Sequence, residues 1–258
     1  MPDRQPLPGK FVWFELVSND PKKAQAFYGE VLGWKVQAFP MGDQTYEMIY
    51  AGDTMIGGYA APKSARQPAH WISYVSVEDV DAAVKAAADN GGKVIDAPYE
   101  IPGVGRSARI ADPQRAEICP FKNATGDPAD EDASQGRFFW NELHTTDTAK
   151  ALAFYAKVVG FSSRPMDMGP DGTYHVLERN GVGRGGATDQ MAPGTAPHWL
   201  PYVFVDDPDG TIAKARKLGA TIQFGPADIP GVGRFGVLQD PTGAVLAVMK
   251  PRPAASQA

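Results

Sequence analysis

Apolar residues recur with a helical period at four places in the chain. The first group has the spacing of a helix with one buried face: Ala24, Phe27, Tyr28, Val31 and Leu32. Asp20 is a good N-cap, Pro21 suits the first helical position, and Gly33 is a natural helix end. A helix over about residues 21–32 is therefore expected.

Three further helices follow from the same kind of pattern. Asp147 precedes a second copy of the first one, which ends near Gly160. A helix from Val80 is stopped by Gly91 and Gly92, and residues 208–219 hold its counterpart. Short runs bounded by Gly, Pro or Asp predict strands, among them Thr45–Tyr50, Met55–Ala60, Trp71–Val77, Ser107–Ile110 and Ala116–Phe121.

The chain repeats itself at a nearly constant offset. Residues 11–34 read FVWFELVSNDPKKAQAFYGEVLGW and residues 138–161 read FFWNELHTTDTAKALAFYAKVVGF, with 12 of 24 positions identical. HWISYVSV from His70 matches HWLPYVFV from His198, and IPGVGR occurs at Ile101 and at Ile229. Such a repeat indicates a duplication, with two strand–helix–three-strand modules in each copy.

Residues 124–135 separate the two copies and contain small, acidic and turn-forming residues. We expect an exposed linker there, with copy 1 as a domain at residues 1–123 and copy 2 at residues 136–258. The expected fold is α+β: a tandem duplication of four βαβββ modules forming two curved-sheet cups. The copies are expected to pack as an intramolecular pseudo-dimer, in a chain that is monomeric or homodimeric.

Composition narrows the function. Of the 258 residues, 43% are hydrophobic and 21% charged, which is typical of a globular protein. The net charge of -5, without a basic cluster, argues against nucleic acid as a partner. No apolar run is long enough for a membrane span, and residues 1–10 contain no apolar segment of a secretion signal. A cytoplasmic location is expected, and the single cysteine, Cys119, is read as a small buried hydrophobe.

These motifs resemble the vicinal oxygen chelate superfamily, which includes glyoxalase I, bleomycin resistance proteins and extradiol dioxygenases. The resemblance rests on the FY and LGW motifs at Phe27 and Leu32, on their echoes at Phe154 and Gly160, and on the two Asp-Pro turns, Asp112-Pro113 and Asp240-Pro241. It covers nearly the whole chain. It implies the fold and a small-molecule ligand, but not one activity, because the family includes isomerases, lyases, dioxygenases and drug-binding proteins.

The resemblance also implies where a metal would be bound. Family enzymes carry a His on the first strand, a second ligand on the middle strand and a Glu on the last strand of a cup. Counting from the capping and Asp-Pro aspartates places the first and last positions at Trp13 and Cys119 in copy 1 and at Trp140 and Ala247 in copy 2, and the middle-strand positions fall near Ile72 and Leu200. The usual metal set is absent, so no metal ligand is assigned.

Strand alternation suggests what the cups contain instead. Glu15 shares a face with Trp13, and Glu142 and His144 share one with Trp140. His70 and Tyr74 likewise share a face, as do the matching residues of copy 2: His198 and Tyr202. The glutamates and the histidines at positions 70 and 198 are the candidate acid–base groups, and the Trp and Tyr residues and His144 are candidate ligand contacts.

Each of these residues also has a structural reading. The glutamates can be hydrogen-bonded at the cup rim, and a histidine at the start of a strand is often simply a satisfied polar group. Arg106 and Arg234, which follow the doubled IPGVGR loop, are either anion-binding arms over the cups or the charged ends of surface turns.

Two functions remain open from the sequence. The first is a binding protein for a flat aromatic or carbonyl-bearing molecule. The second is a glyoxalase-like lyase or related enzyme that uses Glu and His, or a divalent metal at a shifted site made by Glu142, His144 and His198. A third expectation is that only one copy has kept its site, and the additional His144 favours copy 2.

Metal analysis of the purified protein by mass spectrometry separates these hypotheses. One equivalent of Zn, Ni or Fe is expected from a shifted metal site in copy 2. A metal-free protein is expected from the binding hypothesis.

Overall fold

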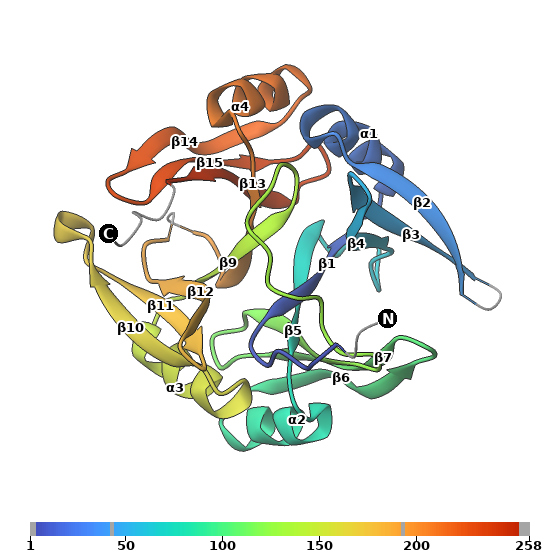
Figure 1. The fold of residues 1–258 in the computed structure, drawn as a ribbon, viewed down its shortest axis with the longest axis vertical. Helices are drawn as coiled ribbons and strands as arrows, with labels where there is room; N and C mark the ends of the chain where they lie inside the picture. The colour runs from blue at the N-terminus through green and yellow to red at the C-terminus, as the bar shows by residue number, and fades with distance from the viewer. Residues whose placement is uncertain (1–3, 42–43, 192–193, 253–258) are drawn as a thin grey trace. The chain divides into compact units, whose positions relative to one another are not determined.

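The computed structural model describes residues 4–41, 44–191 and 194–252, and within them the βαβββ order occurs four times (Figure 1). Copy 1 begins with β1 (Phe11–Val17), α1 (Pro21–Leu32), β2 (Lys35–Met41), β3 (Gln44–Ala51) and β4 (Thr54–Ala60). Its second module comprises β5 (His70–Ser76), α2 (Val80–Asp89), β6 (Lys93–Ile101), β7 (Gly105–Ala111) and β8 (Glu117–Asn123).

Copy 2 repeats this order. Its first module comprises β9 (Phe138–His144), α3 (Thr148–Val158), β10 (Ser162–Asp167), the short 3₁₀ helix η1 (Gly169–Asp171), β11 (Thr173–Arg179) and β12 (Val182–Thr188). Its second module comprises β13 (His198–Phe204), α4 (Pro208–Lys217), β14 (Thr221–Ile229), β15 (Gly233–Gln239) and β16 (Val245–Pro251). The predicted α+β fold with four modules is confirmed.

Each copy forms one eight-stranded sheet, and the two sheets have equivalent strand orders. These are β2-β3-β4-β1-β5-β8-β7-β6 and β10-β11-β12-β9-β13-β16-β15-β14. Successive strands after each helix pair antiparallel, whereas β9 pairs parallel with β12 and β5 with β8. The helix of each module supplies the crossover that a parallel pair requires.

The strand directly after each helix is the one that the apolar pattern did not single out. β2, β6, β10 and β14 are the sheet edges and are largely exposed, so they lack a run of apolar residues. Each contains one proline: Pro40, Pro98, Pro165 or Pro226. Proline is tolerated at an edge, where it also discourages pairing with another chain.

The aspartate caps predicted for the helices are confirmed. The Asp20 carboxylate accepts a hydrogen bond from Lys23 N at 3.1 Å, and Asp147 does the same for Lys150 N at 3.1 Å. Gly33 ends α1 with φ 73°, a conformation that favours glycine. No helix among the described residues is long and apolar enough to cross a membrane.

The linker between the copies is exposed over residues 129–132, but it is anchored at its start. The Asp127 side chain is buried and accepts hydrogen bonds from Leu7 N at 2.7 Å and from Ser76 Oγ at 2.6 Å. The limits predicted for the two domains stay a prediction, and residues 1–3 and 253–258 at their outer ends lie outside the described residues.

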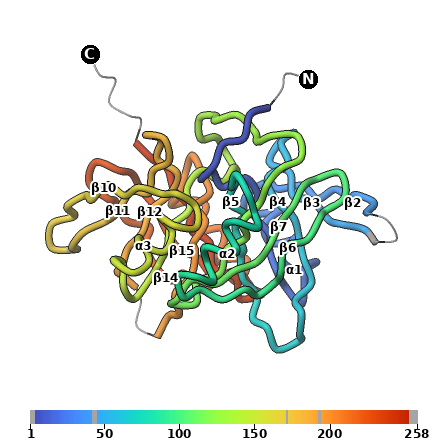
Figure 2. Tube along the Cα trace, turned by 90° about the horizontal axis from the view of Figure 1, so that it is seen from below, coloured from blue at the N-terminus to red at the C-terminus, as the bar shows by residue number. Residues whose placement is uncertain are grey.

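Tertiary contacts divide the chain into two compact units that are each built from both copies. Unit 1 comprises residues 1–14, 72–131 and 140–200. Unit 2 comprises residues 15–71, 132–139 and 201–258. Unit 1 therefore contains α2 and α3, which are neighbours (Figure 1 and Figure 2), and unit 2 contains α1 and α4.

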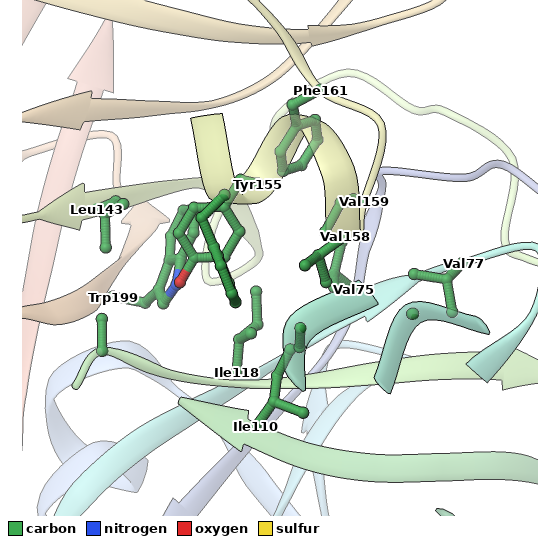
Figure 3. Packing of buried hydrophobic residues seen from close by; sticks show 14 of the residues in the cluster. Val75, Val77, Ile110, Ile118, Leu143, Tyr155, Val158, Val159, Phe161 and Trp199 are labelled. Carbon is green, nitrogen blue, oxygen red and sulfur yellow. The ribbon is translucent and has the colours of Figure 1, made fainter. Parts of the chain in front are cut away.

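The core of unit 1 joins apolar residues of the two copies. Ile110 and Ile118 of copy 1 pack in one cluster with Leu143, Tyr155 and Trp199 of copy 2 (Figure 3). All five are at most 4% exposed. Because this apolar surface is shared, burial in unit 1 stabilises an association of modules from different copies.

A buried polar contact lies within this core. Tyr155 Oη donates a hydrogen bond to Asp112 Oδ2 at 3.3 Å and accepts one from Trp199 Nε1 at 2.9 Å. Burial raises the pKa of Asp112, and burial followed by the charge of Asp112 raises the pKa of Tyr155. The FY motif of copy 2 thus contacts the Asp-Pro turn of copy 1.

Unit 2 holds the corresponding group with the copies exchanged. Trp71 Nε1 donates to Tyr28 Oη at 3.3 Å, and burial followed by the charge of Asp240 raises the pKa of Tyr28. Asp240 Oδ2 is buried and has no hydrogen-bond partner within the described part of the chain. The unit 1 group is therefore the better satisfied of the two.

We expect Tyr155→Phe to lower the free energy of unfolding by about 1–3 kcal/mol, because it leaves both the Trp199 N–H and the Asp112 carboxylate without this partner. Urea unfolding followed by circular dichroism measures this loss. Tyr28→Phe is the matched control and should cost less, since the Trp71 bond is longer. An equal or greater loss in Tyr28→Phe would contradict the assignment.

Candidate functional site

Strand β9 brings three of the candidate residues to one face in unit 1. Trp140 Nε1 donates a hydrogen bond to Tyr174 Oη at 2.8 Å, and His144 Nε2 lies 2.8 Å from Glu142 Oε1. Leu143, between Glu142 and His144, is fully buried in the helix-side core. The predicted alternation of side chains along this strand is therefore confirmed for copy 2.

The hydroxyl of Tyr174 links the aromatic and acidic parts of this face. Burial is the main cause that raises the pKa of Tyr174, followed by the negative charge of Glu142, to which the hydroxyl is also hydrogen-bonded. Glu142 is only 9% exposed, so its carboxylate depends on such partners. Tyr174 stays protonated and acts as a donor to Glu142.

His198 lies against His144, with ring centroids 5.0 Å apart and planes inclined by 17°. Its Nδ1 lies 2.9 Å from the carbonyl oxygen of Ala196, which can only accept, so Nδ1 carries the proton. Burial is the main cause that lowers the pKa of His198, so the ring is neutral at pH 7. Nε2 of this neutral ring is then an acceptor.

Gly186 on β12 makes room for Tyr174. A Cβ atom at this position would overlap the Tyr174 hydroxyl, and Gly58 has the same relation to the hydroxyl of Tyr46 in unit 2. Both glycines therefore keep space for a tyrosine that sequence reasoning did not assign to the site. The missed signal was that Tyr46 and Tyr174 are identical residues at the repeat offset of 128.

Copy 1 contains the same glutamate–tyrosine contact as copy 2. In unit 2, Tyr46 Oη donates to Glu15 Oε1 at 2.7 Å, and His70 Nδ1 lies 2.9 Å from the carbonyl oxygen of Pro68. Val17 occupies the position that matches His144. The half-buried Trp13 lies two residues before Glu15 on β1. The Glu–Tyr pair is thus common to both copies, whereas the histidine two residues after the glutamate occurs in copy 2 only.

The second module of each copy presents different side chains beside its candidate tyrosine. Tyr202 stacks on Phe235 with centroids 6.3 Å apart, and Phe235 is next to Phe224 at 5.1 Å, all within unit 2. In unit 1, Tyr74 makes an edge contact with Phe121 at 6.1 Å. Copy 2 therefore has the larger aromatic cluster.

A part-buried ion pair occurs in copy 1 where copy 2 is apolar. Arg109 and Glu117 are joined at 2.6 Å, and the Arg109 side chain is 11% exposed. The matching positions of copy 2 are Val237 and Val245. The two sheet faces have therefore diverged in polarity.

The structure does not bring Arg106 or Arg234 to these residues. Arg106 pairs with Asp81 at 2.7 Å and with Glu100 at 2.8 Å. Arg234 is bonded to Asp209 at 2.7 Å, and this contact is the main cause that lowers the pKa of Asp209. These contacts fit the surface-turn reading of the IPGVGR loops, because both arginines are occupied by acidic residues of the neighbouring helix.

The side chains do not fit the metal of the related enzymes. Trp140 Nε1 is engaged by Tyr174, and Leu200 and Cys119 are buried among strands. Within residues 4–41, 44–191 and 194–252, no group of three or more His, Cys, Asp or Glu side chains is arranged to hold a metal ion. A divalent metal at Glu142, His144 and His198 would require these side chains to rearrange, and it stays a prediction.

Comparison with known proteins agrees with this architecture. A model of the Glyoxalase/Bleomycin resistance protein/Dioxygenase superfamily matches residues 10–119 and 137–248. A Mycobacterium tuberculosis protein named "Putative glyoxylase CFP32" is 36% identical over 246 residues, which cover 93% of this chain and 94% of the relative. The anthracycline biosynthesis protein DnrV of Streptomyces peucetius is 29% identical over 262 residues, covering 95% and 94%.

Solved structures show the same fold at low identity. The Mn(II)-bound glyoxalase from Novosphingobium aromaticivorans has a TM-score of 0.65 and 18% identity, covering 95% of this chain and 83% of that one. An extradiol ring-cleaving dioxygenase from B. fuscum has a TM-score of 0.66 and 18% identity, covering 97% and 74%. At these identities the likeness concerns the fold alone.

We expect Gly186→Ala to displace Tyr174, because the new methyl group would overlap its hydroxyl, and to cost about 1–3 kcal/mol of unfolding free energy. Thermal unfolding and the Tyr174 ring signals in NMR spectra measure the effect. Gly183→Ala on the same strand is the control, since its Cβ would meet ordinary contacts at 3.7 Å. Equal stability of the two variants would argue against the tight fit at Gly186.

Proposed function

The chain belongs to the glyoxalase/bleomycin resistance protein/dioxygenase superfamily, and from this premise we propose that copy 2 binds a small aromatic or carbonyl-bearing molecule beside Trp140, Glu142 and His144. One observation carries the proposal. It is the continuous set of contacts from Trp140 through Tyr174 and Glu142 to His144, on a single sheet face.

The chemistry of this set suits a flat molecule with one or two oxygen atoms. The indole of Trp140 and the ring of Tyr174 offer apolar surface together with an N–H and an O–H. Glu142 accepts a hydrogen bond from a ligand hydroxyl, and His144 reaches a ligand oxygen from the same face. A buried carboxylate that is held by neighbours is preorganised for such contacts, because it loses little freedom on binding.

The names of the relatives support the same range of ligands. One relative is named for anthracycline biosynthesis and the other as a glyoxylase. The first name agrees with a flat aromatic ligand and the second with a small carbonyl compound. Both types are compatible with the side chains around Glu142.

A second candidate function is acid–base catalysis, which the Glu142–His144 contact favours. Glu142 would take a proton from a carbon atom next to a carbonyl group and return it to a neighbouring atom, so that no further reactant is consumed. His144 would stabilise the carboxylate between these steps, and the neutral His198 would not add a competing charge. This reaction would be an isomerase or lyase step.

Copy 2 is the half that we propose to be functional. Copy 1 has Val17 in place of His144, so a histidine two residues after the glutamate occurs in copy 2 only. A ligand oxygen beside Glu142 would therefore meet an imidazole at this position, where copy 1 offers the apolar side chain of Val17. One ligand per chain is expected at this pair of equivalent positions.

The Glu142→Gln variant separates the two candidate functions. In a binding protein, the affinity for a hydroxylated anthraquinone measured by calorimetry should change by less than about tenfold, because glutamine keeps the shape and an acceptor oxygen. In an enzyme, turnover of a dicarbonyl such as methylglyoxal should fall by about 100-fold or more, with affinity retained.

Glu15→Gln is the matched control in copy 1, since Glu15 has the same tyrosine contact. It should leave both the affinity and the stoichiometry of one ligand per chain unchanged. Loss of binding in Trp13→Ala but not in Trp140→Ala would show that copy 1 is the functional half and would refute the assignment.

A further inference from the structure

The two Asp-Pro turns differ at their third residue. Copy 1 reads Asp112-Pro113-Gln114, whereas copy 2 reads Asp240-Pro241-Thr242. Each turn lies in the same compact unit as the start of the first helix of the other copy: α3 in unit 1 and α1 in unit 2. The contacts between an Asp-Pro turn and a helix start can therefore be compared between the two units.

In unit 1, the carboxamide of Gln114 forms hydrogen bonds through both its oxygen and its nitrogen at the start of α3. Its Oε1 accepts hydrogen bonds from Thr145 Oγ1 at 2.6 Å, from Thr146 Oγ1 at 2.7 Å and from Asp147 N at 2.6 Å. Its Nε2 donates to the carbonyl oxygen of Asp147 at 2.8 Å. The segment before the helix is thus a receptor for a planar group whose oxygen accepts several hydrogen bonds.

In unit 2, the shorter Thr242 does not reach the matching segment. Its hydroxyl donates to Asp240 Oδ1 of its own turn at 2.7 Å. A cavity of about 380 Å³ lies there instead, lined by Pro241 and Thr242 of copy 2 and by the following residues of copy 1: Ser18, Asn19, Asp20, Lys23, Ala65, Arg66, Gln67, Pro68 and Ala69. This volume exceeds that of a glutamine side chain and falls within the usual range for small-molecule sites.

In unit 1 the Thr145 hydroxyl donates to Gln114, but the matching hydroxyl in unit 2 has no such acceptor in the part of the chain that the structure describes. Ser18 matches Thr145, lines the cavity and is 2% exposed. Its Oγ accepts a hydrogen bond from Asp20 N at 3.1 Å, but no acceptor for its own proton occurs among the described residues. A ligand oxygen in the cavity is therefore a suitable acceptor for the Ser18 hydroxyl.

The cavity is also positively charged on one side. Lys23 and Arg66 line it, and neither forms an ion pair with any residue that the structure describes. The Asp20 carboxylate is occupied by Lys23 N as the cap of α1, a helix of 12 residues. Asp20 also lines the cavity, so its two cations exceed its carboxylates by one charge, which favours an anion over a neutral amide.

We propose that this cavity of unit 2 binds a small carboxylate-bearing molecule, with its carboxylate in the place that the Gln114 carboxamide fills in unit 1. One carboxylate oxygen accepts from Ser18 Oγ, and Lys23 and Arg66 neutralise the charge. The remaining volume takes the rest of the molecule. This site is separate from the one proposed at Glu142.

Thr242→Gln tests the proposal by reproducing the unit 1 arrangement in unit 2. Benzoate and acetate are the probes, and their binding is followed by NMR shifts of the Ser18 and Asn19 amides and by calorimetry. The variant should lose benzoate binding and melt at a higher temperature than the unliganded wild type. Thr242→Val is the matched control, which keeps the cavity and should still bind.

Charge variants test the recognition itself. Lys23→Gln and Arg66→Gln should each weaken benzoate binding by about tenfold, while benzyl alcohol, which lacks the carboxylate, should shift neither amide. Glu142→Gln should leave the benzoate-induced shifts of the Ser18 and Asn19 amides unchanged, so failure of this proposal is distinguishable from failure of the proposed function. The proposal is overturned if neither probe shifts these amides, or if Thr242→Gln binds benzoate as tightly as the wild type.

Discussion

Everything else in the fold depends on the association of modules from different copies. In unit 1, apolar strands of copy 1 share a core with α3, and the hydroxyl of Tyr155 meets the carboxylate of Asp112 inside that core. Burying the carboxylate is unfavourable unless a donor is present, so the tyrosine and the aspartate require each other. This requirement selects one pairing of the modules. In unit 2 the FY motif again meets an Asp-Pro turn, since burial and then the charge of Asp240 raise the pKa of Tyr28.

The two copies show which features the fold needs and which it leaves free to vary. The Glu–Tyr contact and the glycine next to the tyrosine hydroxyl occur in both copies, so they are conserved features of this sheet face. The Arg109–Glu117 pair of copy 1 and the aromatic cluster of copy 2 are divergent. Duplication permits such divergence because the contacts common to both copies maintain the fold while other positions change in one copy. The same logic applies to Gln114 and Thr242, where one copy fills a space that the other leaves open.

The candidate residues fall into two groups: those whose charge is neutralised by an ion pair, and those that lie on the proposed binding face. Arg106 and Arg234 are saturated by acidic partners near the surface, where such pairs contribute little to stability. Glu142 is held by partners that still present an aromatic surface and a second imidazole. A preorganised carboxylate of this kind is useful for binding and for proton transfer alike, so its environment alone supports both proposed functions.

The sequence by itself determined the duplication, the four helices, the aspartate caps of two of them and the faces of the opening strands, because these follow from local periodicity and from repeat identity. It did not single out the edge strands, whose exposure removes the apolar signal. Only the tertiary structure decided that each compact unit mixes the copies, that Tyr174 joins Trp140 to Glu142, and that Arg106 turns away to Asp81. Those contacts connect residues far apart in the chain. Their geometry depends on which modules pack together, and no local sequence pattern encodes that packing.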